Sequence, residues 1–253
     1  MDVANSRVVV VGGVRRLGRT IALDLASRGA AVCVTTHRPG AETDAQVEAL
    51  RLAGAPKATA VAGDVRTATG AAELVDAGAD ELGGLDVLVF AASGPFVPTP
   101  PQAVSEQSWD ASFDTIAKGF FFSAGAARRR MQAGAAGEQH QDTGVIVAIT
   151  DLLGVQPWPA FSAHGAAKAA LIHLVRELAA AWAGDGIRVC GIAPGPVDLE
   201  DDEHRAATLR TARGEAERLV GPDDIAAAVR FCLSTAGVTG VNIPVDNGSL
   251  LGV

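Results

Sequence analysis

The sequence predicts a single-domain α/β Rossmann fold, a doubly wound parallel sheet of about seven strands with helices on both faces. Short apolar runs alternate with amphipathic stretches from end to end, which is typical of this architecture. The chain has 253 residues, of which 48% are hydrophobic and 20% charged, enough to bury one large core. No repeat or change of composition divides it. We therefore expect residues 1–253 to form one domain.

Seven runs rich in Val, Ile and Ala are the expected strands, at residues 7–11, 31–36, 58–62, 86–91, 144–149, 187–192 and 240–245. Continuous apolar runs of this length are typical of strands that are buried on both faces. The clearest helix is expected at 163–183, where Leu171, Val175 and Leu178 recur at helical spacing and form one apolar stripe. This stripe is expected to face the sheet or another subunit.

Two polar stretches interrupt the pattern, at residues 134–143 and 199–221. We expect both to lie on the surface. The second precedes Pro222, which begins a good helix start, and it is a candidate for a mobile cover over a ligand site.

Charge and composition exclude several classes of protein. The 21 Lys and Arg residues against 29 Asp and Glu residues give a formal net charge of −8, which argues against general binding of nucleic acid or anionic membranes. No apolar run approaches the roughly 18 residues of a membrane span. Nothing at the N-terminus marks the chain for export, and Cys33, Cys190 and Cys232 lack metal-ligand spacing. We expect a cytoplasmic protein with no disulfide and no metal, acting on a small molecule.

A phosphate-binding turn is predicted directly after the first strand. Residues 12–18 read GGVRRLG and lead into an apolar helical stretch. Backbone N–H groups and the helix dipole favour an anion at such a turn, and glycine lets the backbone approach it closely. Many α/β proteins use a Gly-rich turn for geometry alone, but its position after the first strand favours a diphosphate site.

The end of the second strand indicates which nicotinamide cofactor this turn would hold. Sites that prefer NAD place an acidic residue about 20 residues past the glycines, on the ribose 2′-hydroxyl. Here residues 35–38 read Thr-Thr-His-Arg, and Arg15 or Arg16 can reach the same place. Because arginine matches a phosphate with bidentate geometry, we expect NADP(H) over NAD(H). The alternative is that these residues are a solvated basic loop.

With these motifs the whole chain resembles the short-chain dehydrogenase/reductase family, and more narrowly its pteridine-reductase-like members. The phosphate turn is similar to their variant with arginine in place of the middle glycine, and His37-Arg38 to their NADP-binding pair. Asp64 falls on the family's adenine-binding aspartate, and residues 194–197 (PGPV) resemble its nicotinamide-binding turn. The resemblance implies a homodimer or homotetramer, consistent with apolar helices near 105–132 and 163–183. It also implies these cofactor-binding residues: Gly12, Arg15, Arg16, Leu17, Gly18, His37, Arg38, Asp64, Val65, Ala91, Ala92, Ser93, Lys168, Pro194, Gly195 and Val197.

The catalytic positions depart from the family. Its Tyr-x-x-x-Lys motif falls on His164 and Lys168, and the chain contains no tyrosine. The family's serine, thirteen residues before the tyrosine, falls on Asp151, where pteridine-reductase-like members also have aspartate. The resemblance implies a catalytic set of Asp151, His164 and Lys168, in which Lys168 also contacts the ribose. An imidazole with a pKa near 6.5 can exchange a proton at neutral pH, so His164 is the expected donor.

Two further family motifs are altered. The Asn-Asn-Ala-Gly segment reads Phe-Ala-Ala-Ser at residues 90–93, where the final Ser93 again follows the pteridine-reductase pattern. The asparagine of the family's proton relay is expected within residues 109–119, where we find only Thr115 or Ile116. The ordinary relay is therefore not expected.

Ser93, Phe96, Trp158 and Phe161 are the candidate substrate residues. Aromatic faces can flank a planar compound by offset stacking, but these three rings can equally be core or interface residues. Two functions remain open. One is an NADPH-dependent reductase of a small planar carbonyl or imine compound. The other is a protein that binds NADP(H) without redox chemistry and uses His164 as a base for isomerisation, elimination or cyclisation, or serves an interaction role.

Overall fold

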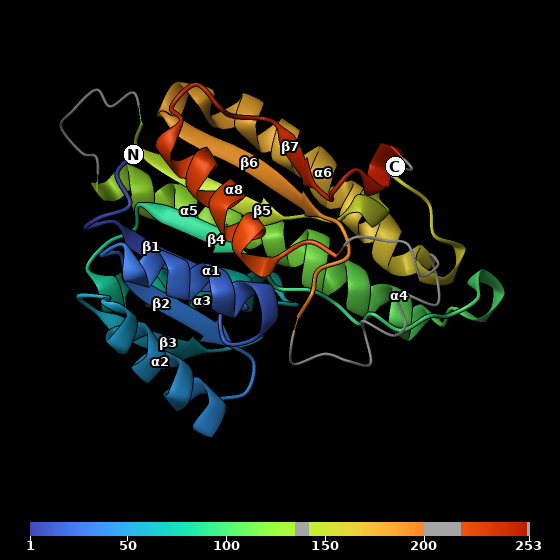
Figure 1. Ribbon diagram of the computed structural model, residues 1–253, viewed down its shortest axis with the longest axis horizontal. Coiled ribbons are helices and arrows are strands. Elements are labelled where there is room, and N and C mark those ends of the chain that lie inside the picture. The colour runs from blue at the N-terminus through green and yellow to red at the C-terminus, as the bar shows by residue number, and fades with distance from the viewer. Residues whose placement is uncertain (135–141, 200–218, 252–253) are drawn as a thin grey trace.

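The computed structural model describes residues 1–134, 142–199 and 219–251, which form one α/β domain around a seven-stranded parallel sheet (Figure 1). The strand order is β3-β2-β1-β4-β5-β6-β7. This confirms the predicted fold, and each predicted strand is present. The strands are β1 (Arg7–Val11), β2 (Ala31–Thr36), β3 (Ala58–Ala62), β4 (Val87–Phe90), β5 (Gly144–Ile149), β6 (Ile187–Pro194) and β7 (Asn242–Val245).

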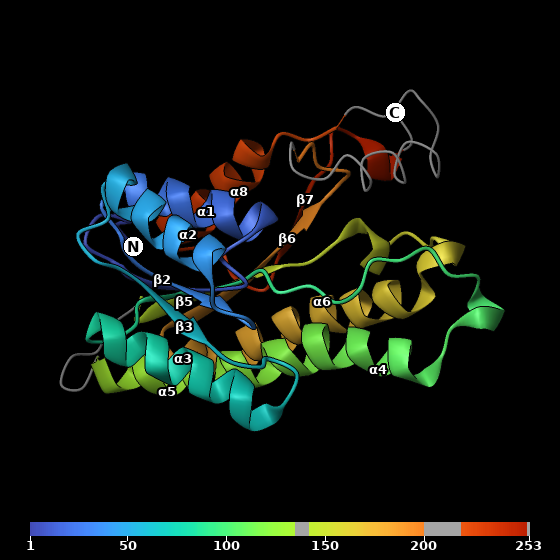
Figure 2. The ribbon, with the colours of Figure 1, turned by 90° about the horizontal axis from the view of Figure 1, so that it is seen from below.

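Helices cover both faces of the sheet, as Figure 2 shows from below. Helices α1, α2 and α8 pack on one face, and α3, α5 and α6 pack on the other. Their bounds are α1 (Arg16–Ser27), α2 (Ala41–Ala53), α3 (Ala68–Leu82), α4 (Glu106–Phe113), α5 (Gly119–Gly134), α6 (Ser162–Trp182) and α8 (Pro222–Ser234). The helices expected at 163–183 and from Pro222 are therefore both present.

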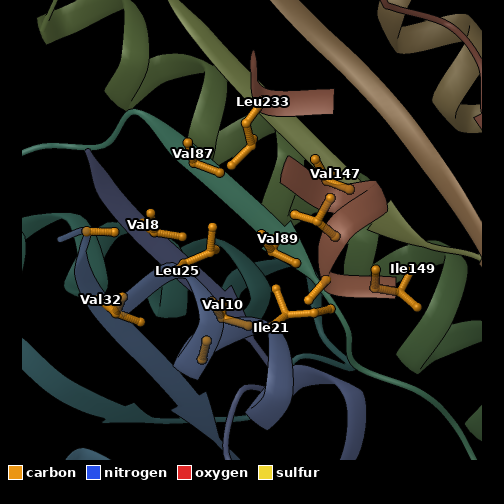
Figure 3. Packing of buried hydrophobic residues seen from close by; sticks show 14 of the residues in the cluster. Val8, Val10, Ile21, Leu25, Val32, Val87, Val89, Val147, Ile149 and Leu233 are labelled. Carbon is orange, nitrogen blue, oxygen red and sulfur yellow. The ribbon is translucent and has the colours of Figure 1, made fainter. Parts of the chain in front are cut away.

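Alternate residues of each strand supply the two cores. Val8 and Val10 of β1 pack with Ile21 and Leu25 of α1 in one cluster, which Figure 3 shows. Val9 lies in the cluster on the opposite face. Because successive side chains of a strand point to opposite faces, a strand covered on both sides must be apolar at every position. This burial explains the continuous apolar runs of the sequence.

One local feature differs from the expected helix near 105–132. A π-helical turn, Asp114–Lys118, joins α4 to α5, so this region is not one regular α-helix. Short π-helical segments occur frequently at functional sites. The polar stretches expected at 134–143 and 199–221 lie mostly outside the described residues, and so does the cover expected of the second.

Three of the exclusions drawn from composition can be compared with the described residues. Within residues 1–134, 142–199 and 219–251, no helix is both long and apolar enough to cross a membrane. In the same ranges, no group of three or more His, Cys, Asp or Glu side chains is arranged to hold a metal ion. All three cysteines are buried free thiols.

Candidate active site

A cleft of about 620 Å³ opens at the carboxyl ends of the parallel strands. The strand order reverses between β1 and β4, and such a switch point leaves a crevice outside the strand ends. All of the expected cofactor-binding residues line this cleft, namely Gly12, Arg15, Arg16, Leu17, Gly18, His37, Arg38, Asp64, Val65, Ala91, Ala92, Ser93, Lys168, Pro194, Gly195 and Val197. The fold thus brings them together, while their roles in binding stay predictions.

The turn after β1 is shaped by two glycines that tolerate no side chain. Gly12 has φ +79°, and a Cβ there would lie 3.0 Å from the Ala92 backbone. A Cβ on Gly18 would lie 2.1 Å from the Gly12 carbonyl oxygen. Helix α1 begins at Arg16, and the Arg15 side chain at its N-cap does not cap it. The first-turn N–H groups therefore face the cleft without a side-chain cap, a geometry that suits a diphosphate.

The end of the cleft with the phosphate turn also holds charges of both signs. The cleft-lining set here includes His37, Arg38 and Arg66. Asp64 accepts hydrogen bonds from Arg66, Nε to Oδ1 at 2.8 Å and Nη2 to Oδ2 at 2.6 Å. These bonds lower the pKa of Asp64 to about 2. Sequence reasoning missed Arg66, although its place two residues after Asp64 was a usable signal.

The catalytic candidates come from two neighbouring elements. Asp151 follows β5 and accepts a hydrogen bond from the Leu153 N–H at 3.0 Å. His164 and Lys168 lie one turn apart on α6. The His164 Nε2 is 3.5 Å from the Asp151 Oδ2, and the Lys168 Nζ donates to the carbonyl oxygens of Ile149 at 2.8 Å and Thr150 at 3.1 Å. The structure therefore brings the predicted trio together.

The electrostatics of Asp151 favour its carboxylate form. Burial raises the pKa of this carboxyl, but the hydrogen bond with His164 and the positive charge of Lys168 lower it by more. The net shift of the Asp151 pKa is therefore downward, and the group is ionised at neutral pH. A carboxylate can accept a proton from a neighbouring group.

The expected proton donor is not in the wall of the cleft. Asp151 and Lys168 line the cleft, whereas His164 is absent from its lining and its side chain is 3% exposed. The edge of His164 meets Phe96, with ring centroids 5.1 Å apart. His164 therefore lies beside Asp151 and does not itself line the cleft.

The predicted substrate residues also divide into one that lines the cleft and three that do not. Ser93 lines the cleft, but the three aromatic residues do not. Phe96 stacks on Phe161 with centroids 4.3 Å apart, and Trp158 is 5.7 Å from Phe161. The three rings form one cluster, in which Phe96 contacts His164.

The π-helical turn decides which of two residues reaches the site. Thr115 lines the cleft, while Ile116 is fully buried. Sequence reasoning also missed several lining residues that flank the predicted motifs, including Thr35, Thr36, Gly63, Leu74, Thr150 and Leu199. Their closeness to those motifs in the sequence was the only available signal.

Comparisons with known proteins agree with this geometry. A family model described as "Enoyl-(Acyl carrier protein) reductase" matches residues 12–249. A cis-4-hydroxycyclohexanecarboxylate dehydrogenase of Sinomonas cyclohexanicum is 34% identical over 95% of this chain and 94% of its own length. A 4-formylbenzenesulfonate dehydrogenase of Comamonas testosteroni is 31% identical over 98% of this chain and 99% of its own length.

Solved structures show the same relationship. A putative short-chain alcohol dehydrogenase from Sinorhizobium meliloti 1021 superposes with TM-score 0.85 at 32% identity, covering 99% of this chain and 98% of its own. A short-chain dehydrogenase from Burkholderia cenocepacia J2315, in complex with NADP, superposes with TM-score 0.84 at 27% identity. The match covers 98% of this chain and 99% of that chain. Fold, cleft and relatives define an oxidoreductase of the Rossmann type with a nicotinamide-cofactor site. The chain belongs to the short-chain dehydrogenase/reductase family.

Proposed function

We propose that the protein is an NADP(H)-dependent oxidoreductase that reduces a small, planar carbonyl or imine compound. One observation carries this proposal: a single cleft is lined by the phosphate turn, by the basic residues His37 and Arg38, and by the catalytic candidates Asp151 and Lys168. His164 lies directly behind Asp151. The names of two relatives, a 4-formylbenzenesulfonate dehydrogenase and a cis-4-hydroxycyclohexanecarboxylate dehydrogenase, support a substrate that carries a ring.

The residues present fit a phosphorylated nicotinamide cofactor. The N–H groups at the start of α1 would hold its diphosphate, and Arg15, His37 and Arg38 its ribose phosphate. Asp64 would contact the adenine, and the backbone of residues 194–197 the nicotinamide amide. The bound cofactor supplies the hydride. Lys168, fixed by two carbonyl oxygens at the end of β5, would hold the other ribose.

The protein's own side chains would manage the proton. Asp151 faces the cleft, and His164 lies behind it at hydrogen-bonding range. In the reduction, His164 in its protonated form would give its proton to the Asp151 carboxylate, and Asp151 would pass this proton to the substrate heteroatom. This division of roles accommodates an imidazole that is shorter than the phenol of the family's tyrosine.

The proposal also places the chain near the pteridine-reductase-like members of its family. Four features support this placement, namely Arg16 in the phosphate turn, the His37-Arg38 pair, Ser93 and Asp151, and all of them line the cleft. The histidine at position 164 remains the main departure. We further propose a cytoplasmic location, which suits three buried free thiols.

A second candidate function is binding of NADP(H) without redox chemistry. Two observations favour it: the chain has no tyrosine, and His164 does not line the cleft. In this case the cleft would serve an isomerase, lyase or cyclase reaction, or an interaction role.

Cofactor titration followed by a turnover assay tests both candidates. We expect NADPH, titrated by fluorescence, to bind at least about tenfold more tightly than NADH because of the basic end of the cleft. Cyclic aldehydes, ketones and imines should then oxidise bound NADPH. Equal affinities for the two cofactors, or no binding of either, would contradict the cofactor assignment. Tight binding of NADPH without oxidation by any compound would favour the non-redox function.

A further inference from the structure

The arginine of the phosphate turn is held by a carboxylate from the next helix. Glu42 lies in the first turn of α2, where a negative charge is favoured by the helix dipole. The Arg15 Nε lies 2.7 Å from each Glu42 carboxylate oxygen, and Arg15 Nη2 also contacts Glu42 Oε2. Arg15 at the same time lines the cleft beside His37 and Arg38.

We infer that Glu42 is a specificity-determining residue that, by holding Arg15, weakens the preference of this cleft for a phosphorylated ribose. The inference rests on the proposed binding of NADP(H) and deepens it. No acidic residue stands at positions 35–38, where NAD-preferring sites carry one. The fold nevertheless brings a carboxylate to the arginine of this site, from a position that the spacing of the sequence did not indicate.

The guanidinium geometry explains the competition. A guanidinium presents a planar fork of N–H donors, and a carboxylate or a phosphate engages the same fork in bidentate fashion. Glu42 already occupies the Nε and Nη2 side of Arg15. A ribose phosphate must therefore displace this carboxylate or share the donors with it, beside a like charge that repels it.

The solvent exposure of the Arg15–Glu42 pair determines how strongly the pair can reduce NADPH affinity. The side chains of Arg15 and Glu42 are 72% and 53% exposed. Exposed ion pairs contribute little net stability and are screened by salt, so a phosphate dianion can displace Glu42. The pair should consequently reduce NADPH affinity by a factor of several, without abolishing binding.

The other carboxylate at this end of the cleft is differently placed. Asp64 is engaged by Arg66, its neighbour two residues along the chain, and this pair does not involve Arg15. Asp64 can therefore be neutralised while Arg15 remains available to a ligand. Among the described residues, Glu42 is the carboxylate that competes with a ribose phosphate for Arg15.

The test compares E42Q with the wild-type chain by titrating NADPH and NADH at low salt. Removing the charge should raise NADPH affinity about fivefold and change NADH affinity less than twofold. The gain should shrink at 0.5 M salt, since exposed charges are then screened over a few ångströms. E48Q is the matched control, because Glu48 lies on the same helix, is 59% exposed and pairs with Arg51 outside the cleft. It should leave both affinities unchanged.

A double-mutant cycle isolates the role of Arg15. The gain caused by E42Q should disappear when R15M is also present, because the released guanidinium is then absent. An unchanged or weaker NADPH affinity in E42Q would overturn the inference, as would a gain that persists in the R15M background. Failure of the wild-type chain to bind NADPH would instead contradict the proposed function.

Discussion

The structure sets His164 behind Asp151 and against Phe96. If it exchanges the proton through Asp151, His164→Phe should lower turnover by about 10²–10⁴ while NADPH affinity stays nearly constant. Steady-state kinetics and cofactor titration measure the two effects. The wild-type pH profile of turnover should bend in the imidazole range, and this bend should vanish in the variant. Full reductase activity in His164→Phe would contradict the role of His164.

The substitution His164→Tyr distinguishes the two candidate functions. Should the wild-type chain never oxidise NADPH while His164→Tyr does, the natural protein has left redox chemistry. The cofactor site would then be intact, and the non-redox function would be the better account.

Lys168 combines a structural and a binding role. Lys168 is 3% exposed, and its ammonium donates to two backbone carbonyl oxygens at the end of β5. Lys168→Ala should weaken NADPH binding about tenfold, since hydrogen bonds to charged groups contribute about 1.5–3 kcal/mol, and it should lower turnover as well. Lys118→Ala is the control, because Lys118 is exposed and pairs with Asp114. Equal cofactor affinities in the two variants would rule out the ribose contact.

At the scale of the element, Arg188 of β6 binds the end of α8 to the sheet. Arg188 is 5% exposed, and its guanidinium donates to the carbonyl oxygens of Leu233 at 2.9 Å and Val238 at 3.2 Å. Its Nε donates to Asp142 at 2.9 Å. Arg188→Met should lower the free energy of unfolding by about 3 kcal/mol, because it leaves buried carbonyl acceptors without their donor and removes one of the two cations beside Asp142. Denaturant unfolding measures this loss.

The exposed Arg51, which pairs with Glu48 on α2, provides the comparison for Arg188. Arg51→Met should cost less than about 1 kcal/mol. A similar loss of stability in both variants would show that Arg188 does not fix α8 to the sheet.

The contact between Arg188 and Asp142 predicts how the stability of the fold depends on pH. Burial raises the pKa of Asp142, but hydrogen bonds from Arg188 and the N-terminal ammonium lower it by more, so the net shift is downward. A carboxyl with a depressed pKa in the folded state stabilises that state above its unfolded pKa of about 3.9, and this contribution is lost as the pH falls through the folded value. Unfolding curves should therefore show a loss of stability below about pH 4 that is smaller in Asp142→Asn. An equal loss in both proteins would contradict this role for Asp142.

The elements also show how far the sequence could predict this molecule. The seven strands were predictable because burial on both faces forces apolar residues at every strand position, as in β1. The cleft-lining motifs were predictable because glycine and proline turns are local. The Arg15–Glu42 pair, the π-helical turn and the packing of Phe96 on His164 were not predictable, since each depends on how separate elements approach one another.

For the whole molecule we propose a homodimer or homotetramer, formed through the face of α4, α5 and α6. Trp109, Phe121 and Phe122 of α4 and α5 are each about 40% exposed, which is unusual for large aromatic residues on one pair of helices. Light scattering should give twice or four times the chain mass of 25.7 kDa at micromolar concentration. Phe121→Glu should lower this mass by placing a charge at the interface. A monomeric mass for the wild-type chain would contradict the proposal.

The reversal of strand order between β1 and β4 has a consequence for the history of this chain. The described residues that line the cleft fall into two stretches of the chain, residues 11–74 and residues 91–199. The two parts of the lining are therefore encoded by separate stretches of the gene. Mutation and recombination can alter one stretch while selection maintains the other. A lineage can in this way change the residue at position 164 and still inherit its phosphate turn without a change.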